Sequence, residues 1–154
     1  MFAEYNRREI ARAILNEMDL SVWDYFETIH NYIEFGSNIV RKGAISAKVG
    51  ERVLIPINMR DGCIIGIGKG NEDWNYSAPH GAGRLMSRSR AKELINLEDF
   101  EKSMTGIYTT SVNQSTIDES PMVYKPLEEI VANIADTVDI LRIIKPIYNF
   151  KACE

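Results

Sequence analysis

Cysteine is scarce in this sequence, with two among 154 residues, Cys63 and Cys153. Two cysteines cannot form the several disulfides on which small secreted scaffolds depend, so we expect a reducing compartment, the cytoplasm. Long hydrophobic runs are also lacking, and typical ones, at 53–55 and 63–65, are three residues long. A helix that crosses a bilayer needs about 20 consecutive apolar residues. We therefore expect no membrane partner.

A large excess of either charge is absent as well. The chain has 18 Lys and Arg against 22 Asp and Glu, a net charge of −4. This balance argues against bulk electrostatic binding of nucleic acid, which needs clustered basic residues. The local cluster of Arg84, Arg88, Arg90 and Lys92 is by itself typical of a solvated helix face. Because 45% of the residues are hydrophobic, a chain of this length can bury roughly two thirds of its unfolded surface in one core.

Hydrophobic periodicity predicts several helices. Apolar residues recur at helical spacing over 4–18, and a second, shorter helical stretch is expected at 21–29. Helical character returns near Ser87 and over 97–104. The best remaining helix opens at Pro126 and keeps its apolar spacing to Val138, since proline suits the first helical turn.

The middle of the chain is predicted to form a β-hairpin. Residues 51–59 and 63–68 are β-branched, apolar runs separated by Arg60-Asp61-Gly62, and Asp-Gly between such runs is a strong hairpin signal. A final strand region is expected over 141–150, interrupted by a proline. We therefore expect one α/β unit of mixed α+β type, in which a β-hairpin and further strands pack against several helices.

A long stretch rich in Gly, Asn, Ser and Pro follows the hairpin, over 66–83. Such a composition is typical of loops, and loops on rigid scaffolds often carry chemistry. The stretch begins with Gly66-Ile67-Gly68-Lys69-Gly70, which matches neither the dinucleotide nor the Walker spacing. We expect this string to be a bulged strand end.

The chain has only two histidines, and their surroundings differ. His30 has no second histidine at metal-ligand spacing, which by composition makes it a poor metal candidate. His80 precedes three small residues and Arg84; small residues let backbone N–H groups approach a phosphate, and arginine binds phosphate oxygens with two parallel hydrogen bonds. A neutral imidazole beside such a cradle could attack phosphorus. An ordinary Gly-rich turn before a helix accounts for the same residues equally well.

Several motifs together resemble the RtcB family of RNA-splicing ligases, because they occur in a compatible order and at compatible intervals. In chain order they are His30-Asn31, Arg41-Lys42-Gly43-Ala44, Ile55-Pro56 with Met59, His80-Gly81-Ala82-Gly83-Arg84 with Ser87-Arg88, Tyr124-Lys125 and Lys151. The resemblance implies that residues 1–154 form the C-terminal part of the RtcB-like ligase fold, with the N-terminal portion absent.

Such a resemblance implies a GTP- and manganese-dependent RNA ligase. In these enzymes the histidine of the HGAGR motif attacks the α-phosphorus of GTP, keeps GMP on its imidazole and releases pyrophosphate. GMP then passes to an RNA 3′-phosphate, or to one formed from a 2′,3′-cyclic phosphate, and a 5′-hydroxyl displaces it. Manganese neutralises the developing charge. The implied partners are GTP and RNA, either tRNA halves or broken RNA.

The motif match also implies a role for each residue. His80 is the expected guanylylated catalytic residue, and His30 is an expected manganese ligand. Lys42 and Arg88 are the expected contacts to RNA phosphates. The expected nucleotide-binding residues are Asn31, Gly81, Ala82, Gly83, Arg84, Tyr124 and Lys151.

The portion of the family enzymes that this chain does not resemble carries most of the metal site. It supplies an Asp, a Cys and two further His to manganese, and an Asn and a Glu near the nucleotide. One interpretation is that the chain works with such a portion as its partner, or as a homo-oligomer, because a split domain leaves apolar surface to cover. The alternative is a truncated, non-catalytic relative that binds nucleotide or a partner protein.

Overall fold

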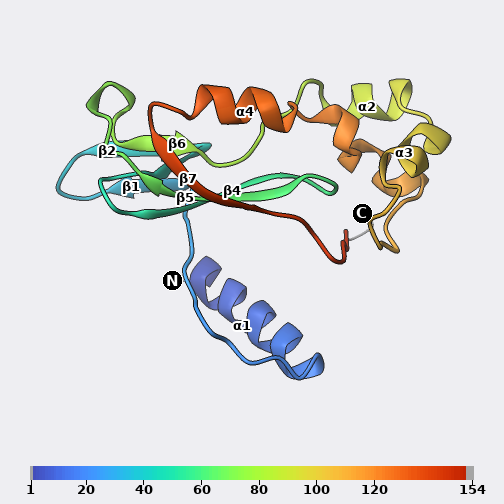
Figure 1. The fold of residues 1–154 in the computed structure, drawn as a ribbon, viewed down its shortest axis with the longest axis horizontal. Helices are drawn as coiled ribbons and strands as arrows, with labels where there is room; N and C mark the ends of the chain where they lie inside the picture. The colour runs from blue at the N-terminus through green and yellow to red at the C-terminus, as the bar shows by residue number, and fades with distance from the viewer. Residues whose placement is uncertain (1, 152–154) are drawn as a thin grey trace.

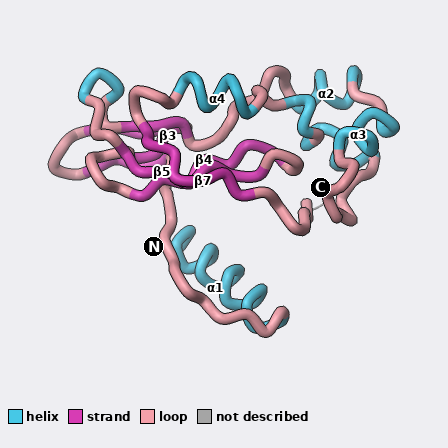
Figure 2. Tube along the Cα trace, viewed as in Figure 1, coloured by secondary structure: helices cyan, strands magenta, loops and turns pink. Residues whose placement is uncertain are grey.

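The computed structural model describes residues 2–151, in which helices and short antiparallel strands form a mixed α+β architecture, as predicted (Figure 1). The strands pair as β1-β2, β3-β6 and β4-β5-β7 (Figure 2). In chain order the elements are α1 (Phe2–Glu17), β1 (Asn31–Glu34), β2 (Ile39–Lys42), β3 (Ala44–Ser46), β4 (Arg52–Asn58), β5 (Gly62–Gly68), η1 (Glu72–Trp74), β6 (Ser77–Pro79), α2 (Arg88–Leu94), α3 (Leu97–Ser103), η2 (Gln114–Glu119), η3 (Pro121–Val123), α4 (Leu127–Asn133) and β7 (Val138–Ile144).

The predicted hairpin is confirmed as β4 and β5. Gly62 ends the turn at a positive φ of 82°, and a side chain there would overlap the carbonyl oxygen of Ile144 on β7. The Asn58 side chain accepts hydrogen bonds from the N–H groups of Arg60 and Asp61, both at 2.9 Å. These bonds close the turn without help from the rest of the sheet.

The third strand of this sheet, β7, pairs with β5. Their register shifts between Ile65 and Gly66, so the glycine-rich string does begin with a bulge, as predicted. One face of the sheet packs under α4, where Ile55 and Ile64 are fully buried in a cluster with Ile130 and Ile134. A second, smaller core lies under α2 and α3 and consists of Met59, Phe100, Met104 and Ile117.

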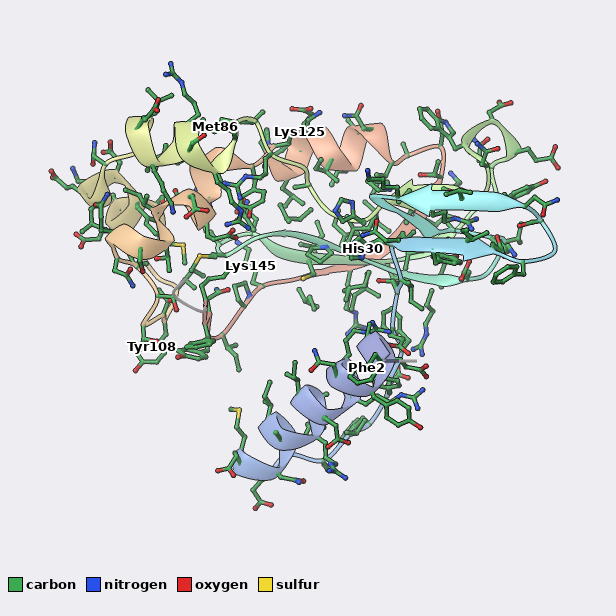
Figure 3. The ribbon with its side chains drawn as sticks, turned by 180° about the vertical axis from the view of Figure 1, so that it is seen from behind. Phe2, His30, Met86, Tyr108, Lys125 and Lys145 are labelled. Carbon is green, nitrogen blue, oxygen red and sulfur yellow. The ribbon has the colours of Figure 1, made fainter. Side chains whose placement is uncertain are left out.

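Apolar surface remains uncovered on α1 and on β7, among other places. The predicted N-terminal helix is confirmed as α1, but it projects from the sheet and buries none of its residues (Figure 3). Strand β7 is exposed beyond Val138, with Leu141 60% exposed. Among residues 2–151, none of the helices combines the length and the apolar character that crossing a bilayer requires.

The expected helix over 21–29 is wrong, since this segment is extended. Arg52 on β4 holds it: its guanidinium pairs with Asp24, donates to the Tyr25 carbonyl oxygen at 3.1 Å and lies 4.3 Å from the centre of the Phe26 ring. A helix would use these backbone groups internally. β-Branched and aromatic side chains, in which the segment is rich, favour the extended form.

The expected extent of the last helix and the last strand also needs correction. Helix α4 ends at Asn133, and Val138, expected on the helix, instead begins β7. The Ile134 carbonyl oxygen ends the helix by accepting from the N–H groups of both Thr137 and Val138, at 2.9 Å. The strand therefore runs over 138–144 and stops before Pro146, which has no N–H to donate to a ladder.

Candidate active site

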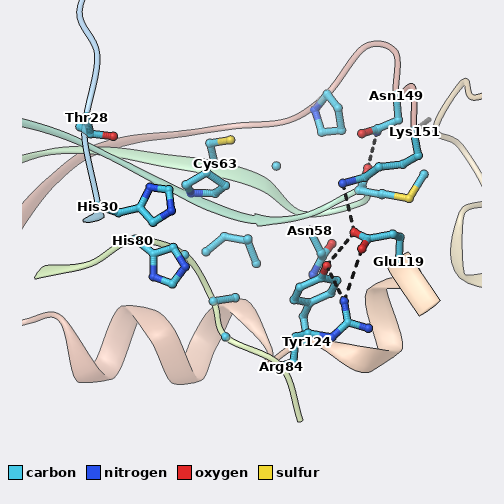
Figure 4. A pocket seen from close by; sticks show the side chains of 18 of the residues that line it. Thr28, His30, Asn58, Cys63, His80, Arg84, Glu119, Tyr124, Asn149 and Lys151 are labelled. Carbon is cyan, nitrogen blue, oxygen red and sulfur yellow. Dashed lines mark hydrogen bonds and ion pairs between the residues drawn. The ribbon is translucent and has the colours of Figure 1, made fainter. Parts of the chain in front are cut away.

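A cleft of about 760 Å³ lies between the β4–β5 hairpin, the segment that follows β6 and the C-terminal segment (Figure 4). His30 and His80 lie at one end, and Arg84, Tyr124 and Glu119 lie at the other. The cleft brings together nine of the predicted site residues, namely His30, His80, Gly81, Ala82, Gly83, Arg84, Arg88, Tyr124 and Lys151.

The two histidines form a stacked pair. Their ring centroids are 4.9 Å apart and their planes differ by 13°. The Nδ1 atom of His80 lies 2.6 Å from the carbonyl oxygen of Gly43. A carbonyl oxygen can only accept, so Nδ1 carries the proton of the neutral ring, and Nε2 keeps a free lone pair. That lone pair is what a nucleophilic imidazole needs.

Gly43 connects the two histidines through its backbone. Its carbonyl oxygen contacts His80, while its N–H donates to the His30 carbonyl oxygen at 3.0 Å and to Asn31 Oδ1 at 3.1 Å. The residue sits at φ +69°, and a Cβ there would lie 3.5 Å from Cε1 and Nδ1 of His80. Other side chains rarely adopt this conformation, so a glycine is required. Asn31, a predicted nucleotide contact, thus uses its amide oxygen to hold Gly43.

One strand pairing and one further backbone hydrogen bond hold these groups in place. Strand β6 pairs with β3, with Ala44 opposite Pro79, which places Gly43 beside His80. The Ala82 N–H donates to the Pro56 carbonyl oxygen at 3.0 Å, which ties the segment after His80 to β4. The predicted catalytic loop is therefore held at both ends by buried strands.

At the other end of the cleft, Glu119 is the centre of a polar cluster. Its carboxylate accepts from the Tyr124 hydroxyl at 2.8 Å and lies 3.2 Å from Lys151 Nζ. Arg88 and Arg84 approach it to 2.7 and 3.4 Å. No motif marks Glu119 in the sequence, because its partners lie up to 35 residues before it and 32 after it. Sequence reasoning therefore missed this residue.

The ionisation of this cluster follows from its surroundings. Burial opposes the ionisation of Glu119, but the Tyr124 hydrogen bond and the Lys151 charge outweigh it, so the pKa of this carboxyl lies below its usual value. Burial, followed by the hydrogen bond to Glu119, raises the pKa of Tyr124 to about 12. At neutral pH the cluster thus contains a carboxylate, a protonated phenol and cations.

The guanidinium of Arg84 is bonded at all three nitrogens. Nη1 donates to the Tyr124 hydroxyl at 3.1 Å, Nη2 donates to the Asp118 carbonyl oxygen, and Nε donates to the Met86 carbonyl oxygen at 3.3 Å. An isolated antiparallel bridge between Arg84 and Tyr124 aligns their backbones. Arg84 therefore forms a rigid wall of the cleft.

The basic cluster on α2 is only partly a solvated face. Arg88 reaches Asp118 at 2.5 Å, and Lys92 lies 4.0 Å from the same buried carboxylate. Asp118 is 3% exposed, so these pairs anchor α2 to η2. Arg90 is exposed, and its one ion pair within residues 2–151 is with Glu93, at 3.2 Å.

The C-terminal segment brings Lys151 to the cleft. The Lys151 N–H donates to the Ser111 hydroxyl at 2.7 Å, and the Asn149 side chain donates to the Met59 carbonyl oxygen. Ser111 is buried, which makes it a firm anchor. Lys42, by contrast, lies on β2 opposite Asn31 and faces a different groove, which His80 also lines.

The residues that could bind a metal are few. His30, His80 and Cys63 line the cleft, and burial raises the pKa of the Cys63 thiol, which keeps it protonated. Within residues 2–151 no group of three or more His, Cys, Asp and Glu side chains is placed to hold an ion. The described residues therefore do not make a complete manganese site. Cys153 lies outside the described residues.

Comparisons with known proteins confirm the family that the motifs indicated. The family model for tRNA-splicing ligase RtcB matches residues 1–152. The RNA-splicing ligase RtcB of Escherichia coli K12 is 36% identical over 124 residues, covering 77% of this chain and 30% of that protein. The tRNA-splicing ligase RtcB of Aeropyrum pernix is 43% identical over 101 residues, covering 62% and 21%. The chain spans less than a third of the length of these relatives, and it belongs to the RtcB family of tRNA-splicing ligases.

Proposed function

We propose that this chain is the GMP-accepting part of an RNA ligase that joins a 3′-phosphate, or a 2′,3′-cyclic phosphate, to a 5′-hydroxyl. The observation that carries the proposal is the 2.6 Å contact between His80 Nδ1 and the Gly43 carbonyl oxygen. In the neutral ring this contact places the proton on Nδ1 and leaves the Nε2 lone pair free, beside a cleft of about 760 Å³. The names of the relatives, RNA-splicing and tRNA-splicing ligases, supply the reaction class.

In the first step, the Nε2 lone pair of His80 attacks the α-phosphorus of GTP. A phosphorus–nitrogen bond forms, and the bond to the pyrophosphate oxygen breaks, so that pyrophosphate leaves with that electron pair. The ring becomes cationic, and the Gly43 carbonyl oxygen stabilises the charge through the Nδ1 proton. No proton has to leave His80, which is the advantage of the tautomer that Gly43 selects.

Two further displacements complete the reaction. An oxygen of the RNA 3′-phosphate attacks the phosphorus of the bound GMP, and His80 leaves as a neutral imidazole. The 5′-hydroxyl of the second strand then attacks the RNA 3′-phosphorus and displaces GMP, and the hydroxyl proton passes to water. A 2′,3′-cyclic phosphate enters this sequence after water has opened its P–O2′ bond to give the 3′-phosphate. The product is an ordinary phosphodiester, and GMP returns to solution.

The nucleotide is proposed to extend from His80 toward the Glu119 cluster. Lys151 and Tyr124 present an ammonium and a hydroxyl at that end of the cleft, both held by the Glu119 carboxylate. Gly81, Ala82 and Gly83 have no bulky side chains, so their backbone can approach phosphate oxygens. In this arrangement Glu119 positions the groups that contact the nucleotide.

Manganese would bind, in this proposal, with His30 as one ligand. One imidazole holds this metal weakly, because manganese lies low in the affinity order and prefers oxygen-rich sites. The other ligands would come from a partner that carries the missing portion of the relatives, and the uncovered apolar surfaces of α1 and β7 would help to bind that partner. A homo-oligomer would cover the same surfaces.

A second candidate is a non-catalytic relative that binds nucleotide or a partner protein. The incomplete set of metal ligands among residues 2–151 favours it. In that case the Glu119 cluster would still bind GTP, but no GMP would remain on His80.

The test is the intact mass of the chain after incubation with GTP and manganese, alone and together with the N-terminal portion of the E. coli relative. The proposal expects a gain of one GMP, lost in acid and absent from His80→Ala. The exposed Arg90→Ala on α2 serves as the matched control and should label normally. Binding of GTP without any adduct in either mixture would favour the second candidate, and an adduct on His80→Ala would remove His80 from its role.

A further inference from the structure

A second groove, of about 660 Å³, meets the cleft at residues 80–83. It is lined by strand β2, helix α4 and the segment that runs from η1 to His80. Its floor is apolar, with Ile130 and Ile134 of α4 among the lining residues. Because His80 lines both hollows, a molecule lying in this groove reaches the proposed nucleophile without passing through the Glu119 end of the cleft.

The charges that line the groove have one sign. Arg41, Lys42 and Lys125 are among the lining residues, and no Asp or Glu is, although the chain as a whole carries −4. Arg41 is buried and its charge is met by Glu34 at 2.7 Å. Lys125, labelled in Figure 3, lies two residues before α4 and pairs with Glu129 on that helix at 2.8 Å. Lys42 is exposed and makes no ion pair within residues 2–151.

An aromatic side chain stands at the same groove. Trp74 is 60% exposed, although an indole of this size usually buries most of its surface. Its loop is well anchored: the Asn71 side chain accepts from the Asp73 N–H at 3.0 Å and donates to the Asp136 carbonyl oxygen at 3.1 Å. An exposed indole that lines the same groove as two lysines is the combination with which proteins bind single-stranded nucleic acid.

We propose that this groove holds the RNA strand whose 3′-phosphate accepts GMP, with a base stacked on Trp74 and backbone phosphates near Lys42 and Lys125. The strand bends into the cleft at residues 80–83, where its terminal phosphate meets His80. This inference rests on the proposed function, and it adds the path of one substrate and a base-stacking residue.

The experiment uses the intrinsic fluorescence of the two tryptophans, Trp23 and Trp74. In Trp23→Phe only Trp74 emits, and a single-stranded RNA of ten nucleotides with a 3′-phosphate should quench it. In Trp74→Phe only Trp23 emits; Trp23 is 96% exposed and lies outside the groove. The same RNA should leave that emission unchanged.

Affinity for a fluorescein-labelled form of this RNA, measured by anisotropy, gives the second readout. Trp74→Ala should weaken binding about 5- to 100-fold, the usual effect of losing a stacked base, while Trp23→Ala should not change it. Lys125→Gln should weaken binding, whereas Lys102→Gln should not. Lys102 is the matched control, because it also pairs with a glutamate four residues away, Glu98 at 2.7 Å.

The outcomes separate this inference from the proposed function. Quenching of Trp74 and a loss of affinity in Trp74→Ala support the groove even if no GMP adduct forms on His80. An adduct on His80 without any Trp74-dependent binding of RNA overturns the groove and leaves the proposed function in place. Equal effects of Trp74→Ala and Trp23→Ala, or binding of an unrelated acidic peptide with the same affinity as RNA, also overturn it.

Discussion

Replacing Glu119 by glutamine tests the polar cluster directly, because Tyr124 reports on that carboxylate. The pKa of Tyr124 is raised to about 12 from an ordinary 10.0, first by burial and then by its hydrogen bond to Glu119 and by the carboxylate charge. Glu119→Gln keeps the burial and removes the charge. Arg84 and Arg88, which lower this pKa, then act unopposed. We therefore expect the pKa of Tyr124 to fall.

The size of the fall can be bounded. Raising the pKa of Tyr124 from 10.0 to about 12 corresponds to about 2.7 kcal/mol in favour of the protonated phenol. Burial, the largest cause of this rise, is unchanged in the variant. Tyr124 is only partly buried, so solvent screening reduces the carboxylate share to about 1 kcal/mol or less. The pKa of Tyr124 is therefore expected to fall by at most about 0.7 pH unit.

The assay is phenolate absorbance after a rapid jump to alkaline pH. Because the pKa of Tyr124 is higher in the folded chain than in the unfolded chain, this tyrosine stabilises the fold fully below pH 10, and that contribution is lost as the pH rises toward 12. The absorbance must therefore be read by a rapid jump, before the chain unfolds. Tyr124→Phe identifies the Tyr124 component among the seven tyrosines. Glu128→Gln, an exposed glutamate on α4, is the control. An unchanged or higher pKa for Tyr124 in Glu119→Gln would refute the account of the cluster.

Three further predictions concern stability and positioning. Gly43→Ala should slow GMP transfer to His80 at least tenfold, as measured by intact mass. It should also lower the free energy of unfolding in urea by about 1 kcal/mol, because alanine is strained at a positive φ. Labelling of this variant at the normal rate would contradict the prediction. Ser111→Ala should weaken GTP binding measured by calorimetry, although Ser111 is not proposed to contact the nucleotide, because the change releases the backbone of Lys151. An unchanged affinity would show that Lys151 needs no anchor. The pKa of Glu34 is lowered to about 2, first by Lys48 and then by Arg41, so its contribution to stability is present above pH 4.5 and lost as the pH falls toward 2. Urea unfolding of Glu34→Gln should therefore show a weaker loss of stability over that range than the parent chain, and parallel curves would argue against it.

Much of the local structure could be predicted from the sequence because it depends on near neighbours. The hairpin followed from Asp61-Gly62 between apolar runs, since the turn needs a positive φ at Gly62. Helices near Ser87 and over 97–104 were expected from the sequence, and the structure shows that the side chains of Ser87 and Asn96 cap them. The order of motifs indicated the family, because ordered motifs are more specific than composition. The hairpin and the helices are each determined by residues within a few positions of the element itself.

Only the tertiary structure decided how the site is assembled. Segment 21–29 is extended because Arg52, more than 20 residues later, holds its backbone. Glu119 is the centre of the polar cluster at one end of the cleft because η2, α2 and the C-terminal segment converge on it, and no local pattern in the sequence marks such a meeting. The tautomer of His80 depends on the Gly43 carbonyl oxygen, 37 residues away, which the pairing of β3 with β6 delivers. Local sequence determines which elements form, whereas long-range pairing determines which side chains meet, because the energy of those contacts exists only after the chain has folded.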